Sequence, residues 1–419
     1  MVPRRHAVVI GAGLTGLLAA KVLTEAFTWV TVLEREQVTG GADALDRLPD
    51  GRRVCVLAPL FGDLVEQLLP GFMDLLRAQG AAAGDILSDV RWYLGGQPLR
   101  QRETGLTGLS VSQAFLEGVL RRVLLQCPGV GIVDSCDVTG LMATADGRRV
   151  TGVRVHPCGE REQGVDADLV VDASGEASHL AWLTRLGVAP PRPDTVHLGV
   201  SEVVRRYRLP VGVLEGDLAV VVAPTCAVPR SGCLVREERG RWALSLGSLV
   251  GDLPRLGDDR SLLRFAGGLA AGDIREVLGE AEPLGEPAFP YVSGRVCFRY
   301  GSARGLPSGL LLMGLGCVHG DLVGSRAATV AALEALVLRE FLGAGGTVSG
   351  YRFHHRAWRL RDRIFARTHA YIPRFSVTLR HLPLSLRLRH RLLDRVVQAA
   401  VCDAEAALRL LGAYGLVRW

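Results

Sequence analysis

Two amino acids are absent or nearly absent from this chain. It contains no asparagine, and Lys21 is the only lysine among 49 basic residues, so arginine carries nearly all of the positive charge. That bias is typical of a GC-rich coding sequence and is not itself a functional signal. A run of 18 apolar residues is also missing, which excludes a membrane-spanning helix of ordinary length. The first residues lead directly into a predicted strand, so we expect no signal peptide and a cytoplasmic protein.

Cysteine is present but follows no pattern. The nine cysteines are scattered and odd in number, and no pair has C-x-x-C spacing. A reduced cytosolic protein without a metal centre therefore fits this pattern better than a disulfide framework or a zinc site. With 419 residues, 48% of them hydrophobic, the chain can bury a large core, and we expect two or three subdomains.

The start of the chain carries the strongest motif. An apolar run, His6–Ile10, is followed by G-A-G-L-T-G at Gly11–Gly16 and by a helical stretch to Thr24. A second apolar run, Trp29–Leu33, ends at Glu34. The order of strand, glycine turn, helix, strand and acid predicts a βαβ unit that binds an ADP moiety.

Four residues of this unit have separate physical roles. Gly11 permits a tight turn, Gly13 lets the backbone approach a pyrophosphate, and Gly16 lets the helix pack closely on the strand. The helix N-terminus then faces the phosphates, and Glu34 can accept hydrogen bonds from ribose hydroxyls. The alternative is a glycine turn without a ligand, which the complete series of elements disfavours.

Further elements are predicted along the chain. Residues 61–135 look mostly helical, and Asp137–Val155 has the pattern of a strand pair. Leu310–Met313 is an apolar strand with a helix after it, and Tyr351–Trp419 is helical. A second sheet is predicted from four β runs, which are Val196–Val204, Leu218–Ala223, Cys233–Val235 and Arg241–Leu249.

This arrangement resembles the FAD-dependent monooxygenases of the para-hydroxybenzoate hydroxylase fold. Within them it is most similar to the bacterial branch that contains the polyene epoxidases of the monensin and lasalocid pathways and flavin-fold Diels–Alderases. The segments that carry the resemblance are Val8–Glu34, Arg47–Gly71, Leu109–Val130, Asp166–Gly187, Gly240–Ser248 and Leu306–Leu336.

The resemblance implies an α/β fold with FAD as the cofactor. It divides the chain into a Rossmann-like FAD-binding domain that is split in sequence, a second β-sheet substrate domain and a helical C-terminal region. The expected bounds are 1–190 for the first part of the FAD domain, 191–300 for the sheet domain, 301–345 for the return segment and 346–419 for the helical region.

The resemblance also assigns further cofactor-binding residues. The segment D-x-x-x-D-A-S-G at Asp168–Gly175 matches the family's second fingerprint, with Asp172 at its acidic position and Gly175 at a close chain crossing. Gln113 stands where relatives often have an arginine near the flavin phosphates, and Gly314 opens the third fingerprint.

The third fingerprint departs from the family pattern. Where relatives have an aspartate that binds the ribityl chain, this sequence has Leu315, and the loop proline that follows is missing. Arg326 falls near a glycine position beside the flavin ring, and family histidines in an earlier loop are replaced by Arg53 and Cys55. The motif that binds the ADP part of FAD is therefore intact, whereas the segment expected beside the flavin ring differs from the family pattern.

Two classes of function follow from these departures. The favoured one is a redox-neutral cyclase that tailors a polyketide, closing a ring in a polyene by a Diels–Alder or related reaction, with FAD structural or vestigial. The alternative is an FAD-dependent monooxygenase or epoxidase that acts on a polyene or an aromatic polyketide. A cofactor-free scaffold protein is the least favoured alternative.

Candidate catalytic residues lie in the rewritten segment. His319 and Asp321 can form an acid–base pair, and Arg326 can grip a carbonyl or an anionic head group. The competing interpretations are a helix cap for Asp321, a backbone-bonded histidine, and a surface position for Arg326. Trp242 and Tyr207 can line a polyene pocket, although core packing is the default for both.

The C-terminal region is rich in arginine. Between Arg352 and Arg395 there are 12 arginines against two acidic residues. No nucleic-acid recognition motif accompanies this charge, so we expect either a solvated helix face or a docking surface. The partners considered are an acyl carrier protein and the anionic head group of a small-molecule polyketide-type substrate.

Overall fold

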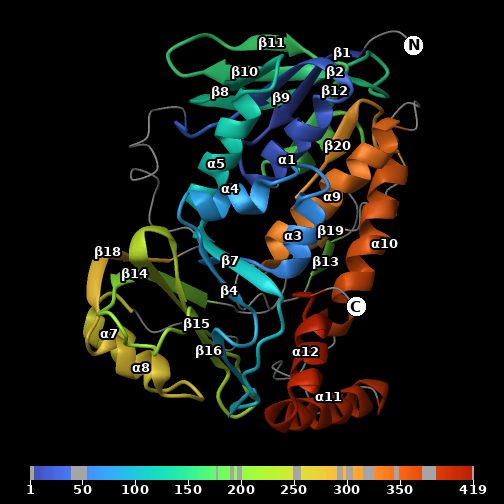
Figure 1. The fold of residues 1–419 in the computed structure, drawn as a ribbon. Coiled ribbons are helices and arrows are strands. Elements are labelled where there is room, and N and C mark those ends of the chain that lie inside the picture. Colours follow the sequence, from blue (N-terminus) through green and yellow to red (C-terminus); the bar gives the residue numbers. More distant parts are fainter. Residues whose placement is uncertain are drawn as a thin grey trace.

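The computed structural model describes residues 4–38, 54–175, 178–188, 193–195, 201–248, 256–289, 296–298, 305–314, 325–343, 349–369 and 384–417. A five-stranded parallel sheet forms the centre of one half of the molecule, at the top of Figure 1. Its strands, in spatial order, are β20 (Leu310–Leu312), β12 (Leu169–Asp172), β1 (Arg4–Ile10), β2 (Phe27–Leu33) and β8 (Val130–Val133).

Both faces of this sheet are covered, as a parallel sheet requires. Alternate residues of β1 point to opposite sides: Ala7 and Val9 pack toward helices, whereas Val8 and Ile10 pack toward an antiparallel meander. The helical layer contains α1 (Leu14–Leu23), α3 (Pro59–Val65), α4 (Phe72–Ala78), α5 (Gln113–Leu125), α9 (Ser325–Gly343) and α10 (Gly350–His369). The other layer contains β9 (Cys136–Ala143), β10 (Val150–Pro157), β11 (Gln163–Asp166) and α6 (Ser178–Arg185).

A seven-stranded sheet forms the centre of the other half (Figure 1). Its order is β18 (Glu282–Ala288), β14 (Ser201–Arg208), β17 (Arg241–Ser248), β16 (Arg230–Arg236), β15 (Ala219–Val222), β5 (Val90–Leu94) and β6 (Gln97–Pro98). One face packs on α7 (Asp259–Ala266) and α8 (Asp273–Leu278), and a 3₁₀ turn, η1 (Glu238–Gly240), joins β16 to β17.

The opposite face of this sheet meets two further elements. A three-stranded sheet of β3 (Val54–Leu57), β7 (Thr107–Ser112) and β4 (Ala82–Asp85) lies between the two halves (Figure 1). The C-terminal helices α11 (Leu384–Cys402) and α12 (Ala404–Ala413) pack against β5 and β15. A small sheet pairs β13 (Pro193–Thr195) with β19 (Val296–Phe298).

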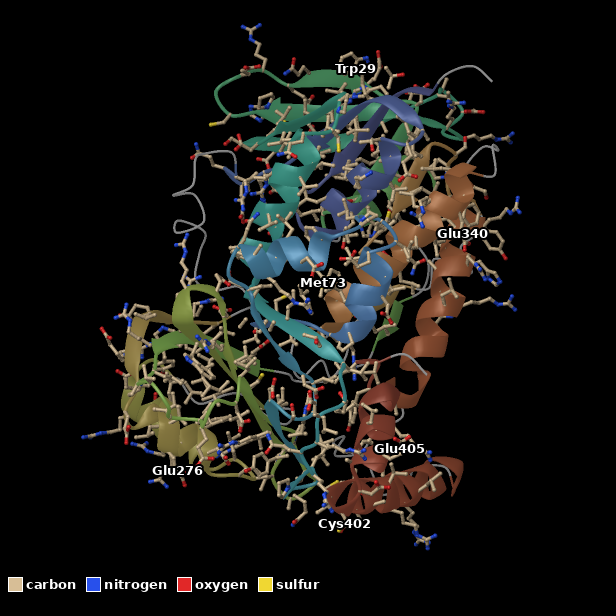
Figure 2. The ribbon with its side chains drawn as sticks, in the orientation of Figure 1. Trp29, Met73, Glu276, Glu340, Cys402 and Glu405 are labelled. Carbon is tan, nitrogen blue, oxygen red and sulfur yellow. The ribbon has the colours of Figure 1, made fainter. Side chains whose placement is uncertain are left out.

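Figure 2 locates these layers by single side chains. Met73 of α4 is buried near the middle of the molecule, whereas Trp29 of β2 lies at the outer end of the first half with 60% of its surface exposed. Cys402 and Glu405 mark the junction of α11 and α12 at the far end. No helix in the described part of the chain is long and apolar enough to cross a membrane.

The predicted fold class is confirmed. The split Rossmann-like domain is seen directly, because β20 returns to pair with β12 after the whole second sheet. The expectation that residues 61–135 are mostly helical is wrong for 82–112, which contains β4, β5, β6 and β7. Two of these strands, β5 and β6, belong to the second sheet although they precede the expected boundary at residue 190. The partner of β5 in that sheet, β15, lies about 130 residues later in the chain, and local sequence cannot reveal such a pairing.

Candidate functional site

The candidate site is the carboxyl edge of the five-stranded sheet. In parallel sheets of this kind, ligands bind at that edge. Three segments predicted to be fingerprints meet there: the turn after β1, the turn after β12 and the turn after β20. The main-chain N–H of Ala173 donates to the carbonyl of Ile10 at 2.9 Å, and that of Met313 donates to the carbonyl of Asp172 at 2.8 Å.

The three glycines of the first turn are there for different reasons. Gly11 has φ +97°, and an added Cβ would lie 3.0 Å from the Ala173 carbonyl oxygen. A Cβ on Gly16 would lie only 1.9 Å from the carbonyl oxygen of Gly11, so the packing of α1 on the turn excludes any side chain. For Gly13 the nearest atom, Oε1 of Glu117, would be at 3.5 Å, an ordinary contact. Packing within the chain therefore requires Gly11 and Gly16 but not Gly13.

Glu34 closes the turn from the end of β2. Its Oε2 accepts a hydrogen bond from the Ala12 N–H at 2.7 Å, and its Oε1 accepts one from the Glu36 N–H at 3.0 Å. The carboxylate is half-buried, so part of it faces outward. It thus holds the turn in place and is positioned at the edge where a ribose would lie in a βαβ nucleotide site.

Gln113 is brought to the same place through a residue that the sequence analysis did not single out. Its amide donates to Oε1 of Glu117 at 2.8 Å, and that oxygen also accepts from the Leu14 N–H, in the first turn of α1, at 3.2 Å. Glu117 is 1% exposed, and an acid at such a position on an apolar helix face is the signal that could have identified it. A negative group at the N-terminus of α1 is favourable there.

The start of α5 is fixed by the second sheet. Ser112 caps the helix by accepting from the Phe115 N–H at 3.1 Å. The Ser112 N–H and hydroxyl both donate to the buried carboxylate of Glu238, at 2.8 and 2.7 Å, and Arg241 pairs with the same carboxylate. The turn between β16 and β17 therefore determines where Gln113 stands.

The second fingerprint forms a buried acid–histidine pair. Oδ1 of Asp172 accepts from the N–H and the hydroxyl of Ser174, at 3.0 and 2.7 Å. Its Oδ2 lies 3.6 Å from Nδ1 of His179, and both side chains are 1% exposed. Gly175 has φ +72°, and an added Cβ would meet no atom within 4 Å. Gly175 thus serves a left-handed turn at an open position.

The third segment begins against the first. Gly314 has φ +71°, and a Cβ there would lie 3.2 Å from Oγ1 of Thr15 in α1. Its N–H donates to Oε2 of the buried Glu334 in α9 at 2.8 Å. His319, Asp321, Leu315 and Arg53 lie outside the described residues.

Arg326 is buried, at 3% exposure, in the first turn of α9. Its Nε donates to the carbonyl oxygen of Tyr414 at 3.2 Å, and its guanidinium lies over the Tyr414 ring, 5.9 Å from the centroid. The competing surface position for Arg326 is therefore wrong. The side chain connects α9 to the segment after α12, whose Leu416 carbonyl accepts from the Leu60 N–H at the start of α3.

A cavity of about 50 Å³ lies between the three-stranded and seven-stranded sheets. Its lining is mostly aliphatic and includes Leu416 from the segment that Arg326 contacts. Tyr207 and Trp242 do not line it: they are cross-strand neighbours on β14 and β17 and pack toward α7 and α8. Cys55 is buried in the core beneath the five-stranded sheet.

Comparison with known proteins supports this architecture. Residues 9–64 match the model of the NAD(P)-binding Rossmann-like domain family. The chain is 31% identical to protein Rv3254 of Mycobacterium tuberculosis over 356 residues, which cover 82% of this chain and 74% of that protein. The chain belongs to the family of Rv3254.

Solved structures show the same fold at low identity. The chondrochloren halogenase CndH of a myxobacterium, a FAD-dependent halogenase, has a TM-score of 0.68 and 17% identity and covers 100% of this chain and 98% of its own. PqsL of Pseudomonas aeruginosa, a probable FAD-dependent monooxygenase, has a TM-score of 0.64 and 15% identity. The match covers 88% of this chain and 98% of PqsL. This member of the Rv3254 family therefore has the fold of FAD-dependent monooxygenases and halogenases.

Proposed function

We propose that the chain binds FAD, with the ADP moiety at the turn after β1. The observation that carries this proposal is Gly13, the one glycine of the three whose absent side chain is not explained by packing within the protein. The open position lies at the N-terminus of α1, where backbone N–H groups and the helix dipole favour a pyrophosphate. Glu34 would contact the ribose, and Gln113 would stand beside the phosphates.

The proposed reaction is the redox-neutral closure of a ring in a polyene of polyketide type. In a [4+2] closure two carbon–carbon single bonds form at the expense of π bonds, and no atom or electron is gained or lost. Such a reaction needs a pocket that folds a flexible chain into a reactive conformer. The replacement of a ribityl-binding aspartate by Leu315 and the loss of the loop proline support a reaction that does not depend on the flavin ring.

Arg326 is proposed to act in this reaction by positioning. Through its hydrogen bond to the Tyr414 carbonyl it holds the segment that contributes Leu416 to the cavity wall. His319 and Asp321 remain the proposed acid–base pair. For the arginine-rich region we keep the proposal that it docks an acyl carrier protein or an anionic head group.

The second candidate is an FAD-dependent monooxygenase, and a specific observation favours it. CndH and PqsL are named as a halogenase and a monooxygenase, respectively, and the chain shares their fold. In that case a bound flavin would supply the electrons for oxygen activation. The protein's own residues would bind the substrate, orient it and exclude water.

Two measurements test the proposal. The visible spectrum of the purified protein should show oxidised flavin, with bands at roughly 370 and 450 nm that belong to the cofactor ring. Incubation of the holoenzyme with a polyene substrate should give a cyclised isomer of unchanged mass, with or without NADPH and O₂. A product heavier by one oxygen atom would replace cyclisation by oxygenation. A colourless protein that does not take up FAD would overturn the proposed FAD binding and exclude the monooxygenase.

A further inference from the structure

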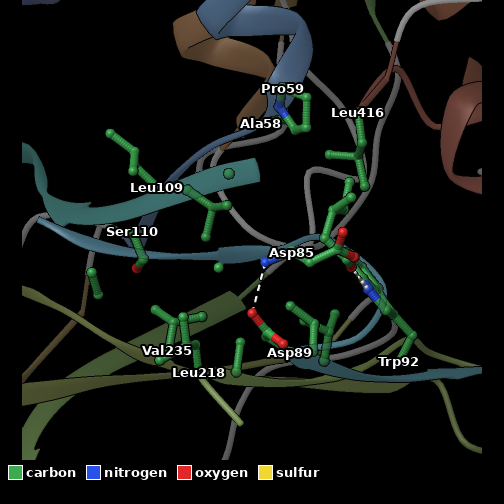
Figure 3. A pocket seen from close by; sticks show the side chains of 18 residues that line it. Ala58, Pro59, Asp85, Asp89, Trp92, Leu109, Ser110, Leu218, Val235 and Leu416 are labelled. Atoms are coloured by element: carbon green, nitrogen blue, oxygen red, sulfur yellow. Dashed lines mark hydrogen bonds between the residues drawn. The ribbon is translucent and has the colours of Figure 1, made fainter. Parts of the chain in front are cut away.

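The cavity between the three-stranded and seven-stranded sheets contains a hydroxyl group that has no hydrogen-bond partner among the described residues. Ser110 lies on β7, where alternation turns Gly108, Ser110 and Ser112 toward the seven-stranded sheet, while Leu109 and Val111 belong to the core above. Figure 3 shows the Ser110 side chain at the cavity, above Val235. It is 8% exposed.

The neighbours of Ser110 cannot supply a hydrogen bond. Its cross-strand partners are Val56 on β3 and Ala82 on β4, both apolar. Its hydroxyl oxygen has no hydrogen-bond partner among the described residues. By contrast, the hydroxyl of Ser112, two residues along the same strand, is bonded to Glu238. Burial of an unpaired hydroxyl is unfavourable, so its persistence indicates a partner that the described residues do not provide.

The other polar groups around the cavity are already engaged. The indole N–H of Trp92 donates to the Ile86 carbonyl at 2.8 Å. Asp85 accepts hydrogen bonds from Leu87, Ser88 and Thr104, and Asp89 accepts from Asp85 and Ser88. Among the lining side chains that the structure describes, Ser110 is therefore the one whose polar atom is buried without a hydrogen-bond partner.

The Asp85 carboxylate limits the charge that the cavity tolerates. Burial by itself would raise the pKa of Asp85, but the hydrogen bonds from Leu87, Ser88 and Thr104 outweigh it and lower the pKa. The Asp85 carboxylate is therefore ionised at neutral pH. A second anion inside the cavity would be repelled by it, so an uncharged guest is favoured.

Water fits this cavity poorly. A volume of about 50 Å³ has room for one or two water molecules, but a buried water needs two to four polar partners. Ser110 offers a single available hydroxyl among aliphatic side chains such as Leu218, Val235 and Leu416. An organic group with one oxygen and an apolar remainder satisfies both the hydroxyl and the walls.

We propose that this cavity binds the uncharged end of the substrate, a carbonyl or hydroxyl that hydrogen-bonds to Ser110, together with the one or two carbons next to it, while the rest of the substrate lies outside. The identity of the substrate as a polyene rests on the proposed function, whereas the site itself rests on the cavity and on Ser110. The assignment also gives the substrate a direction: its charged end, if it has one, lies outside this cavity.

The test uses three six-carbon dienes that differ only at one end. These are 2,4-hexadien-1-ol, its carboxylate analogue 2,4-hexadienoate and the hydrocarbon 2,4-hexadiene. Binding to the purified full-length protein is measured by ligand-observed NMR, together with the thermal unfolding midpoint and the flavin spectrum of each preparation. Ser110→Ala is compared with Ser112→Ala, the same change on the same strand at a hydroxyl that has partners.

The expected result has three parts. The alcohol binds, the carboxylate binds at least about tenfold more weakly, and Ser110→Ala weakens the alcohol about two- to tenfold while leaving the hydrocarbon unchanged. Ser110→Ala leaves the unfolding midpoint unchanged or raises it, because no hydrogen bond is lost. Ser112→Ala lowers the midpoint and leaves the alcohol affinity unchanged.

The opposite results are equally clear. Equal binding of the alcohol by the wild type and Ser110→Ala, no binding of any diene, or a lower midpoint for Ser110→Ala would each overturn the assignment. The flavin spectrum separates this failure from that of the proposed function. A protein that contains flavin but binds no diene would overturn only the cavity assignment. Ser110-dependent diene binding by a protein that cannot take up FAD would overturn only the proposed FAD binding.

Discussion

Gly13→Ala should weaken ligand binding with little effect on folding, whereas Gly16→Ala should destabilise the folded protein. The Gly13 backbone has φ −75° and ψ 176°, which alanine adopts without strain, and the new methyl would meet no protein atom closer than 3.5 Å. As a helix N-cap, alanine is worse than glycine by about 1 kcal/mol or less. The same methyl would project into the path of the pyrophosphate, so the Kd for FAD should rise at least about tenfold.

At Gly16 the same methyl would lie 1.9 Å from the Gly11 carbonyl oxygen and 3.1 Å from its carbon. Both are backbone atoms, so the contact can be relieved only by moving α1 away from the turn. Overpacking of this kind costs about 3 kcal/mol or more. The two variants should therefore differ by about 2 kcal/mol or more in the free energy of unfolding, although each adds one methyl group.

The assay is urea unfolding of the flavin-free variants, followed by titration with FAD and detection by flavin fluorescence. If Gly13→Ala takes up FAD as the wild type does, the turn after β1 is not the pyrophosphate site. If the two variants are equally destabilised, the close approach of α1 to the turn is not as the structure describes it.

Three further predictions concern buried groups. Burial raises the pKa of Tyr207 to about 12. Above the ordinary tyrosine pKa the folded state therefore binds more protons than the unfolded state, so the free energy of unfolding should fall between about pH 10 and 12. Tyrosinate absorbance and urea unfolding over that pH range check this. Glu238→Ala should lower the free energy of unfolding by about 3 kcal/mol because it removes a buried ion pair and two hydrogen bonds, whereas Glu215→Ala, at an exposed ion pair, should have no measurable effect in the same urea titration. Arg326→Ala should lower the thermal unfolding midpoint and expose the segment around Tyr414 to proteolysis. Arg326→Lys should reduce turnover because lysine lacks the planar guanidinium that lies over the Tyr414 ring. Wild-type behaviour of both variants would contradict the positioning role of Arg326.

The nucleotide end could be predicted because its signals are local. The first turn has its three glycines within six residues, and the apolar runs before the turn and after the helix are long enough to be identified as strands. The strand pair β9–β10 and the return strand β20 were found for the same reason. In each case the pattern within a few residues determines the element.

The cavity could not be predicted, because its walls come from distant segments. β4 reads Ala82-Ala83-Gly84-Asp85, a sequence of low strand propensity, and it is a strand because it pairs with β7. The floor depends on the parallel pairing of β5 with β15. Ser110 looks like an ordinary strand serine in sequence, and only the apolar neighbours from three other segments make its hydroxyl unusual.

The contact of Leu416 with the cavity also has a consequence for the order of synthesis. The ribosome makes the nucleotide turn within the first 40 residues, but β12 and β20, the strands that complete its sheet on one side, emerge only after residues 172 and 312. Leu416, which forms part of the cavity wall, emerges later still. All strands of the nucleotide sheet are therefore synthesised before the last residue of the cavity wall. A premature stop after α9 would remove Leu416 from the cavity wall but none of the five strands of the nucleotide sheet.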